Sequence, residues 1–208
     1  MERGIKKDNG FMKVIVTGGS RGLGSAIADV FEPEHDVVRV GKNVCDLSKK
    51  ENIDDFVAAY PVADILINCA GINHVNMDDA WAVNVRAPWE LSKHYVVGME
   101  DRGYGRIVNI GSTSSHKGFK GDVPYCTTKH ALLGMSRALA EEYSGTCVNI
   151  LHIAAAPSKT DMGREIMDGN WSKYIEPYDF AQLVKDMTLK DNSNTYIIKE
   201  VQVDYKRG

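Results

Sequence analysis

Short runs of apolar, often β-branched residues alternate along the chain with longer stretches in which apolar residues recur every three or four positions. A run of four or five apolar residues that stops at glycine or polar residues is typical of a buried parallel strand. The runs that predict strands lie at 13–17, 37–40, 64–67, 106–110, 147–153 and 197–203. The stretches that predict helices lie at 22–31, 78–98, 125–143 and 177–187.

This alternation predicts an α/β fold in which a parallel sheet is covered by helices on both faces. The 208 residues suit one hydrophobic core, and no repeat or linker divides them. We therefore expect a single domain over residues 12–208. Residues 1–11 are mostly charged or small and are expected to form a flexible leader.

Composition narrows the functional classes. The net charge is −3, with 25 basic residues scattered among 28 acidic ones, which argues against nucleic acid as a partner. No apolar run approaches the ~20 residues that cross a bilayer, and no secretory signal is visible. The four cysteines are widely spaced and no histidines cluster with them, so we expect reduced thiols, no metal site and a cytoplasmic location.

The first predicted strand leads directly into a glycine-rich segment, in which Gly18, Gly22 and Gly24 follow Thr17. Glycine permits a sharp turn off the strand and a close approach to a pyrophosphate, and the following helix would direct its free N–H groups at that anion. A glycine-rich turn alone is a weak signal. Its position between a predicted strand and a predicted helix favours a nucleotide-binding loop.

A second group of residues indicates acid–base chemistry. Tyr125 and Lys129 are four residues apart at the start of a predicted helix and therefore share one face. An adjacent ammonium is expected to lower the tyrosine pKa from its usual value near 10. Such a pair is most often part of a solvated helix face. Here Ser112, at the end of the preceding strand, supplies a third polar group that could bind a substrate oxygen.

Taken together, these motifs resemble the short-chain dehydrogenase/reductase family in its ordinary, non-extended form, and the resemblance extends over about residues 13–162. It includes the TGxxxGxG spacing from Thr17, the thirteen residues from Ser112 to Tyr125, and YxxxK. The resemblance implies a Rossmann-type doubly wound parallel sheet, with a shortened region between its second and third strands. It also implies an oxidoreductase that transfers hydride between a nicotinamide cofactor and a carbonyl or alcohol. Members that reduce 3-oxoacyl thioesters look most similar.

The family's roles carry over to matching residues. Ser112 would orient the carbonyl, Tyr125 would protonate its oxygen, Lys129 would lower the tyrosine pKa and hold the nicotinamide ribose, and Asn84 would support a water relay. The residues that would bind the cofactor are Gly18, Ser20, Arg21, Gly22, Leu23, Gly24, Lys42, Asp46, Leu47, Asn68, Ala70, Gly71, Tyr125, Lys129 and Thr160.

NADP is favoured over NAD as the cofactor. Enzymes that prefer NAD usually place an acid at the end of the second strand, where it bonds the ribose hydroxyls. Here that strand ends in Val40-Gly41-Lys42, with no acid. Arg21 and Lys42 could pair with a 2′-phosphate instead, although both could equally be solvated surface cations.

Several segments depart from the family pattern. Cys69 stands where the family has a second asparagine, and Ala155-Ala156 stand where a Pro-Gly pair precedes the Thr160 position. The connections after Val40, after Gly71 and after Met162 are short, which predicts a small or open substrate cleft. His74, His116 and His152 are expected to be ordinary polar or partly buried residues. Met162, Met167, Trp171 and Tyr174 could line a pocket, pack in the core or contact another subunit.

Two functional hypotheses follow. The first is an NADP(H)-dependent oxidoreductase that acts on a small-molecule carbonyl or alcohol, such as a 3-oxoacyl thioester or a small ketone. The second is a catalytically silent NAD(P)-binding sensor or scaffold protein on the same fold. The family's usual pairing surface, formed by the helices that start near Asp78 and Tyr125, implies a homodimer or homotetramer.

Overall fold

A computed structural model describes residues 11–73, 75–165, 171–190 and 197–201. Its strands are β1 (Lys13–Thr17), β2 (Asp36–Val40), β3 (Ile65–Asn68), β4 (Gly105–Ser112), β5 (Val148–Ala155) and β6 (Ile197–Val201). Its α-helices are α1 (Gly22–Phe31), α2 (Lys50–Ala59), α3 (Met77–Trp81), α4 (Ala87–Asp101), α5 (Val123–Glu142), α6 (Asp161–Glu165) and α7 (Pro177–Leu189).

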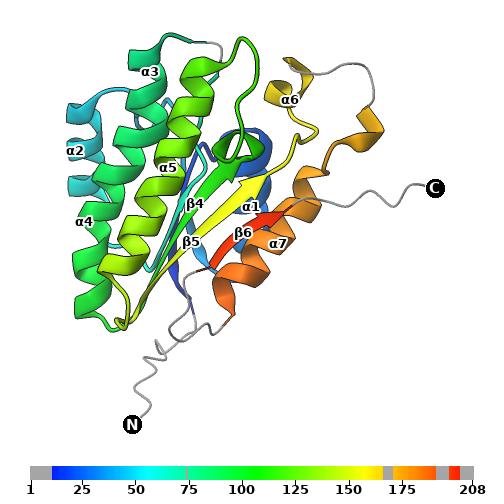
Figure 1. The fold of residues 1–208 in the computed structure, drawn as a ribbon. Coiled ribbons are helices and arrows are strands. Elements are labelled where there is room, and N and C mark those ends of the chain that lie inside the picture. Colours follow the sequence, from blue (N-terminus) through cyan, green and yellow to red (C-terminus); the bar gives the residue numbers. More distant parts are fainter. Residues whose placement is uncertain (1–10, 74, 166–170, 191–196, 202–208) are drawn as a thin grey trace.

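All six strands form one parallel sheet in the order β2-β1-β3-β4-β5-β6. Helices α2, α4 and α5 cover one face of this sheet, and α1 and α7 cover the other (Figure 1). The chain reverses its direction of winding between β1 and β3, which creates a crevice at the carboxyl ends of these strands. The predicted α/β fold of Rossmann type, with a short connection after β2, is confirmed.

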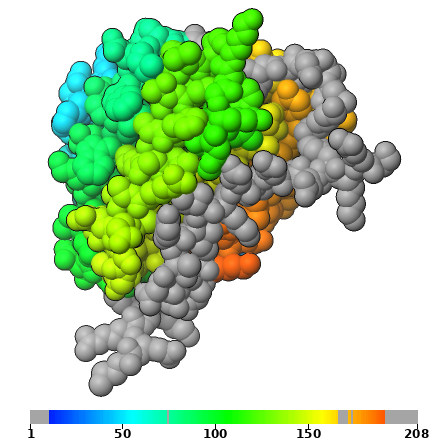
Figure 2. Space-filling model, in the orientation of Figure 1, coloured from blue at the N-terminus to red at the C-terminus, as the bar shows by residue number. Residues whose placement is uncertain are grey.

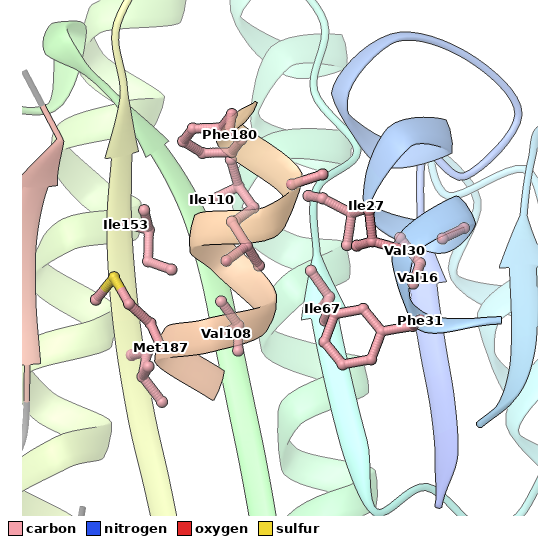
Figure 3. Close-up of a cluster of buried hydrophobic side chains, with 14 of the residues drawn as sticks. Val16, Ile27, Val30, Phe31, Ile67, Val108, Ile110, Ile153, Phe180 and Met187 are labelled. Carbon is pink, nitrogen blue, oxygen red and sulfur yellow. The ribbon is translucent and has the colours of Figure 1, made fainter. Parts of the chain in front are cut away.

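The core has two halves because successive side chains of a strand point to opposite faces of the sheet. Val14 and Val16 pack beneath α1 and α7, and Figure 3 shows how Phe31 and Phe180 fill that half. Ile15, between the two valines, packs on the other side against α2, α4 and α5. A strand buried on both faces needs a continuous apolar run, which is why these strands were visible in the sequence.

The structure adds three features to the predicted elements. Helix α2 was not predicted, since its face toward the core contains only two buried residues, Ile53 and Phe56. The short helix α6 was not predicted either. The single helix expected over 78–98 is divided by a π-helical segment at Ala82–Arg86. The expected leader lies outside the described residues except for Phe11, as does the predicted continuation of the last strand to 203.

Two expectations from the sequence concern membrane helices and disulfide bonds. In the described part of the chain, no helix is long and apolar enough to cross a membrane. All four cysteines are unpaired; Cys45 and Cys126 are buried, and Cys69 and Cys147 are half-buried. Unpaired thiols agree with the expectation drawn from their wide spacing.

Candidate active site

The glycine-rich loop is packed so closely that side chains cannot enter it. Gly18 has a φ of 70°, and a Cβ atom added to it would lie 2.9 Å from the Cα of Ala70. A Cβ atom on Gly24 would lie 2.3 Å from the carbonyl oxygen of Gly18. Helix α1 begins at Gly22, and the side chain of Arg21 does not cap it. The first N–H groups of α1 therefore point toward the crevice, which is the arrangement that binds a pyrophosphate.

Thr17 fixes the position of this loop relative to the next strand. Its Oγ1 accepts hydrogen bonds from the backbone N–H groups of Cys69 (3.0 Å) and Ala70 (3.1 Å), and the side chain is buried. Cys69 contributes a backbone N–H here, which explains how a cysteine can replace the family's asparagine. The sequence motif included Thr17, but its spacing gave no sign of this role.

The opposite wall of the crevice is formed by the segment after β5. The side-chain Cγ2 of Thr160 lies 3.4 Å from the point that a Cβ atom on Gly22 would occupy. The hydroxyl oxygen of Thr160 accepts a hydrogen bond from the N–H of Gly163 in α6. The altered Ala155-Ala156-Pro157 stretch therefore still brings Thr160 to the edge of the glycine loop.

Two backbone hydrogen bonds to Ile175 fix the base of this wall. The backbone of Ile175 donates to Pro157 (3.0 Å) and accepts from Lys159 (2.9 Å). Just before Ile175 in the sequence, the rings of Trp171 and Tyr174 lie 5.3 Å apart. Both aromatic residues and Met162 are half-buried, and Met167 lies outside the described residues.

The end of β2 forms a more open part of the site. Gly41 follows β2, and a Cβ atom on it would lie 3.2 Å from Ser20 Oγ. The side chains of Arg21 and Lys42 are 81% and 87% exposed. Arg21 lies 4.0 Å from the carboxylate of Asp161, and Lys42 lies 3.9 Å from that of Asp46. Contacts of this length and exposure are weak, so both cations are available to an anionic ligand.

Three other predicted cofactor residues have structural partners. Asp46 accepts hydrogen bonds from the hydroxyl and N–H of Ser48, which lower the pKa of its carboxyl group. Leu47 is buried in the core half beneath α4, and Leu23 packs against the other half. Any contact that Leu47 makes with a cofactor must therefore involve the backbone, whereas the side chain of Leu23 is only partly buried.

Asn68 belongs to a buried polar layer beneath the crevice. Its Nδ2 donates to Asn109 Oδ1 (2.8 Å), and Asn109 Nδ2 donates to Ser136 Oγ (2.9 Å). Ser136 Oγ in turn lies 3.0 Å from Nδ1 of His152. These four side chains link β3, β4, β5 and α5. They hold the carboxyl ends of the strands together, so the side chain of Asn68 is a structural one.

The predicted catalytic residues converge where β4 ends and α5 begins. Ser112 is the last residue of β4, and its Oγ accepts the N–H of Ser114 (3.1 Å). Tyr125, in the first turn of α5, forms a side-chain hydrogen bond with Ser112. The Nζ of Lys129 lies 5.6 Å from the centre of the Tyr125 ring and donates to the carbonyl oxygen of Ile110 (3.0 Å). The sequence thus predicted this group of three correctly as neighbours.

Asn84 joins this group through the π-helical segment. Its side chain bonds both the N–H and the carbonyl oxygen of Ile72 (2.9 Å each) and donates to Thr128 (3.0 Å). A Cβ atom on Gly71 would lie 3.5 Å from Lys129 Nζ and 3.6 Å from Asn84 Oδ1, so both polar atoms border one space beside Gly71. π-Helical turns are frequent at functional sites.

Burial controls the ionisation of the catalytic pair. It raises the pKa of Tyr125 to about 12, against the lowering effect of the hydrogen bond with Ser112. It also lowers the pKa of Lys129 to about 8. The pKa of Tyr125 is therefore raised rather than lowered in this structure, where the ammonium of Lys129 lies over the ring and bonds to a backbone carbonyl. At neutral pH Tyr125 holds its proton and can donate it.

The parallel strands end at the glycine-rich loop, where a dinucleotide would lie within reach of the Tyr125 hydroxyl. The fold and the crevice are therefore those of a dinucleotide-dependent oxidoreductase. A family model described as short chain dehydrogenase matches residues 39–171. The chain therefore belongs to the short chain dehydrogenase family. It is an NAD(P)-dependent oxidoreductase that acts on CH–OH or carbonyl groups.

Similar proteins agree in fold and class. The 3-oxoacyl-[acyl-carrier-protein] reductase of Salmonella typhimurium is 30% identical over 186 residues, covering 74% of this chain and 76% of that protein. The acetoacetyl-CoA reductase of Rhizobium meliloti is 30% identical over 197 residues, covering 78% and 80%. A solved structure of a short chain dehydrogenase/reductase family protein has a TM-score of 0.82 at 25% identity, covering 93% of this chain and 97% of its own.

The buried ammonium of Lys129 leads to a prediction about stability. We expect Lys129→Met to raise the free energy of unfolding at pH 7 by about 1–3 kcal/mol, because each unit of pKa lowering corresponds to about 1.4 kcal/mol. The unfolded chain binds the additional proton between about pH 8, the pKa in the folded protein, and pH 10.5, the ordinary value. Wild-type stability should therefore rise with pH across this window, and the advantage of the variant should vanish above it.

Urea unfolding at pH 7 and at pH 10.5 measures both effects. Lys49→Met, at an exposed lysine just before α2, is the matched control and should change the free energy of unfolding by less than about 0.5 kcal/mol. A Lys129→Met variant that is less stable than wild type at pH 7 would show that the hydrogen bond to Ile110 outweighs the cost of burying the charge.

Proposed function

We propose that this protein reduces a carbonyl group with NADPH, with Tyr125 as the proton donor. One observation carries the proposal: a half-buried, protonated Tyr125 is hydrogen-bonded with Ser112, one helical turn from a Lys129 that faces Gly71 in the cofactor crevice. When bound, NADPH supplies the hydride. A pKa of about 12 suits a proton donor at neutral pH better than a base, so the reductive direction is favoured.

The neighbouring residues divide the remaining tasks. Ser112 Oγ accepts the N–H of Ser114, and its hydroxyl hydrogen, which is directed at Tyr125 in this structure, would turn to the substrate oxygen when substrate binds. As the proton leaves Tyr125, the ammonium of Lys129 stabilises the phenolate and also holds the nicotinamide ribose. Asn84 anchors the wall at Ile72 and, with Lys129, borders the space beside Gly71 in which a water relay could return the proton. Alcohol oxidation would use the same groups in reverse.

The substrate class is proposed from two relatives. They are named as reductases of 3-oxoacyl-[acyl-carrier-protein] and of acetoacetyl-CoA, and each matches this chain at 30% identity. We therefore place 3-oxoacyl thioesters first among the candidate substrates and small ketones second.

We expect Tyr125→Phe to lower kcat for NADPH oxidation by about 10²–10⁴-fold, because it removes the proton donor and leaves the ring in place. The measurement is NADPH absorbance with acetoacetyl-CoA, a 3-oxoacyl thioester and a series of ketones. Tyr143→Phe, at the other end of α5, is the matched control and should keep full activity. Full activity of Tyr125→Phe would refute the mechanism, and NADPH binding without turnover on any carbonyl would support the sensor hypothesis instead.

The preference for NADPH is proposed from the charges around β2. The guanidinium of Arg39 is already paired with Glu32 and Asp29 of α1, so it is not available to a phosphate. Arg21 and Lys42 are exposed and only weakly paired, and no acid follows β2 at Gly41. A 2′-phosphate between these two cations would gain charge-assisted hydrogen bonds.

We expect the double variant Arg21→Gln/Lys42→Gln to weaken NADPH binding by about 10–100-fold, since a hydrogen bond to a charged group contributes about 1.5–3 kcal/mol. NADH binding should change by less than about threefold. Fluorescence titration with both cofactors measures this, and Lys49→Gln, at a nearby exposed lysine, is the control. An equal loss for NADPH and NADH would show that these cations do not recognise the 2′-phosphate.

We also propose a homodimer or homotetramer that pairs through α4 and α5. These two helices form much of the face seen in Figure 2. Trp89 and Val97 of α4 are 42% and 59% exposed, and a Cβ atom on Gly134, in the middle of α5, would meet nothing within 4 Å. An exposed glycine weakens a helix by about 1 kcal/mol relative to alanine unless another surface packs closely against it. A second copy of the chain would supply that surface.

We expect light scattering at micromolar concentration to give a dimeric or tetrameric mass for wild type and a monomeric mass for Trp89→Glu/Val97→Glu, because two charges in an apolar interface lose hydration. Tyr178→Glu places a charge at an exposed aromatic residue of α7, on the other side of the sheet, and should leave the mass unchanged. A monomeric wild type would overturn this proposal.

A further inference from the structure

His152 is a buried histidine for which the proposed reaction gives no role. It lies in β5 beside Asn109 of β4 and is 1% exposed. Burial lowers its pKa to about 3, with help from the charge of Lys129, so the ring is neutral at working pH. A neutral imidazole has one nitrogen that donates and one that accepts, and each needs a partner when buried.

The contacts of Ser136 determine which nitrogen of His152 is protonated. The Ser136 hydroxyl donates its single hydrogen to the carbonyl oxygen of Leu132 (2.7 Å). Its oxygen also lies 3.0 Å from His152 Nδ1, which must therefore supply the hydrogen of that contact. Nε2 is then an unprotonated acceptor. It is buried and has no hydrogen-bond partner among the described residues.

His152 packs directly over Gly111, an approach that only glycine allows. A Cβ atom on Gly111 would lie 2.1 Å from His152 Nε2 and 3.0 Å from Ser115 Oγ, so the two polar atoms flank one point beside the backbone of Gly111. Ser115 is also buried, and its Oγ accepts the backbone N–H of Ser112 (3.1 Å). No described acceptor takes the hydroxyl hydrogen of Ser115, and Nε2 of His152 is an unpartnered acceptor on the other side of that point.

We propose that His152 is a positioning residue for the catalytic serine: its Nε2 accepts a hydrogen from one water molecule, and that water accepts the Ser115 hydroxyl hydrogen. With its hydrogen directed at this water, Ser115 presents a lone pair to the N–H of Ser112. This contact fixes the end of β4 and keeps Ser112 facing Tyr125. The catalytic part of this inference rests on the proposed reductase function.

Two substitutions of His152 separate this role from simple packing. Asparagine keeps a donor near the Nδ1 position for Ser136 but has nothing at the Nε2 position. Glutamine reaches the Nε2 position with an acceptor oxygen but loses the Nδ1 donor. We expect His152→Asn to lower kcat about tenfold, with the Kd for NADPH unchanged within twofold, and His152→Gln to keep more of the activity.

Ser115→Ala completes a double-mutant cycle. It should lower kcat about as much as His152→Asn does, and it should cause no further loss when combined with that substitution, because both break one contact. His94→Asn, at an exposed histidine of α4, is the control. A His152→Asn enzyme that is more active than His152→Gln, or additive effects in the double variant, would overturn the proposal.

A measurement without turnover keeps this inference separate from the proposed function. In protein labelled with ¹⁵N in its histidine rings, we expect His152 to be protonated at Nδ1, and its Nε2 signal to shift in Ser115→Ala. Protonation at Nε2, or an unmoved signal, overturns the contact whatever the enzyme assays give. If wild type reduces no carbonyl while the signal shifts as expected, the contact stands and the reductase proposal fails.

Discussion

The hydrogen bonds that Thr17 accepts from Cys69 and Ala70 are the contacts on which the rest of the site depends. They join the carboxyl ends of β1 and β3, where the winding of the sheet reverses and a crevice is unavoidable. Gly18 is packed against Ala70 on one side of this junction, and Gly71 faces Lys129 on the other. One hydroxyl therefore sets the distance between the part of the site that binds phosphate and the part that transfers protons.

The same site concentrates polar groups in a place where burial is costly. Lys129 and Tyr125 both lose hydration, and the pKa of each moves toward the uncharged form. The free-energy cost of burying these two side chains is offset by the apolar surface buried in the two halves of the core on either side of the sheet. For a reductase this arrangement is useful, because a neutral phenol is the form that gives its proton to a developing alkoxide.

Sequence patterns were sufficient for the strands and for the catalytic group. The strands are buried on both faces, and Ser112, Tyr125 and Lys129 lie close to strand or helix ends that the pattern located. Helix α2 was missed because its outer face is polar and its N-cap, Lys49, gives no capping signal. The pKa of Tyr125 could not be predicted, since spacing reveals a neighbouring charge but not the loss of water around it. The position of Thr160 depended on how the chain turns after β5, and the unusual alanines there concealed it.

The π-helical segment at Ala82–Arg86 has a consequence for how this chain can change in evolution. A π turn holds about one residue more than an α turn, so the segment offsets α4 from α3 by about 100° relative to one continuous helix. Asn84 lies within this segment, from which its side chain bonds Ile72 and Thr128. Deleting one residue here would restore a regular helix and rotate every side chain of α4 relative to α3. At this point the number of residues is therefore constrained as strictly as their identity.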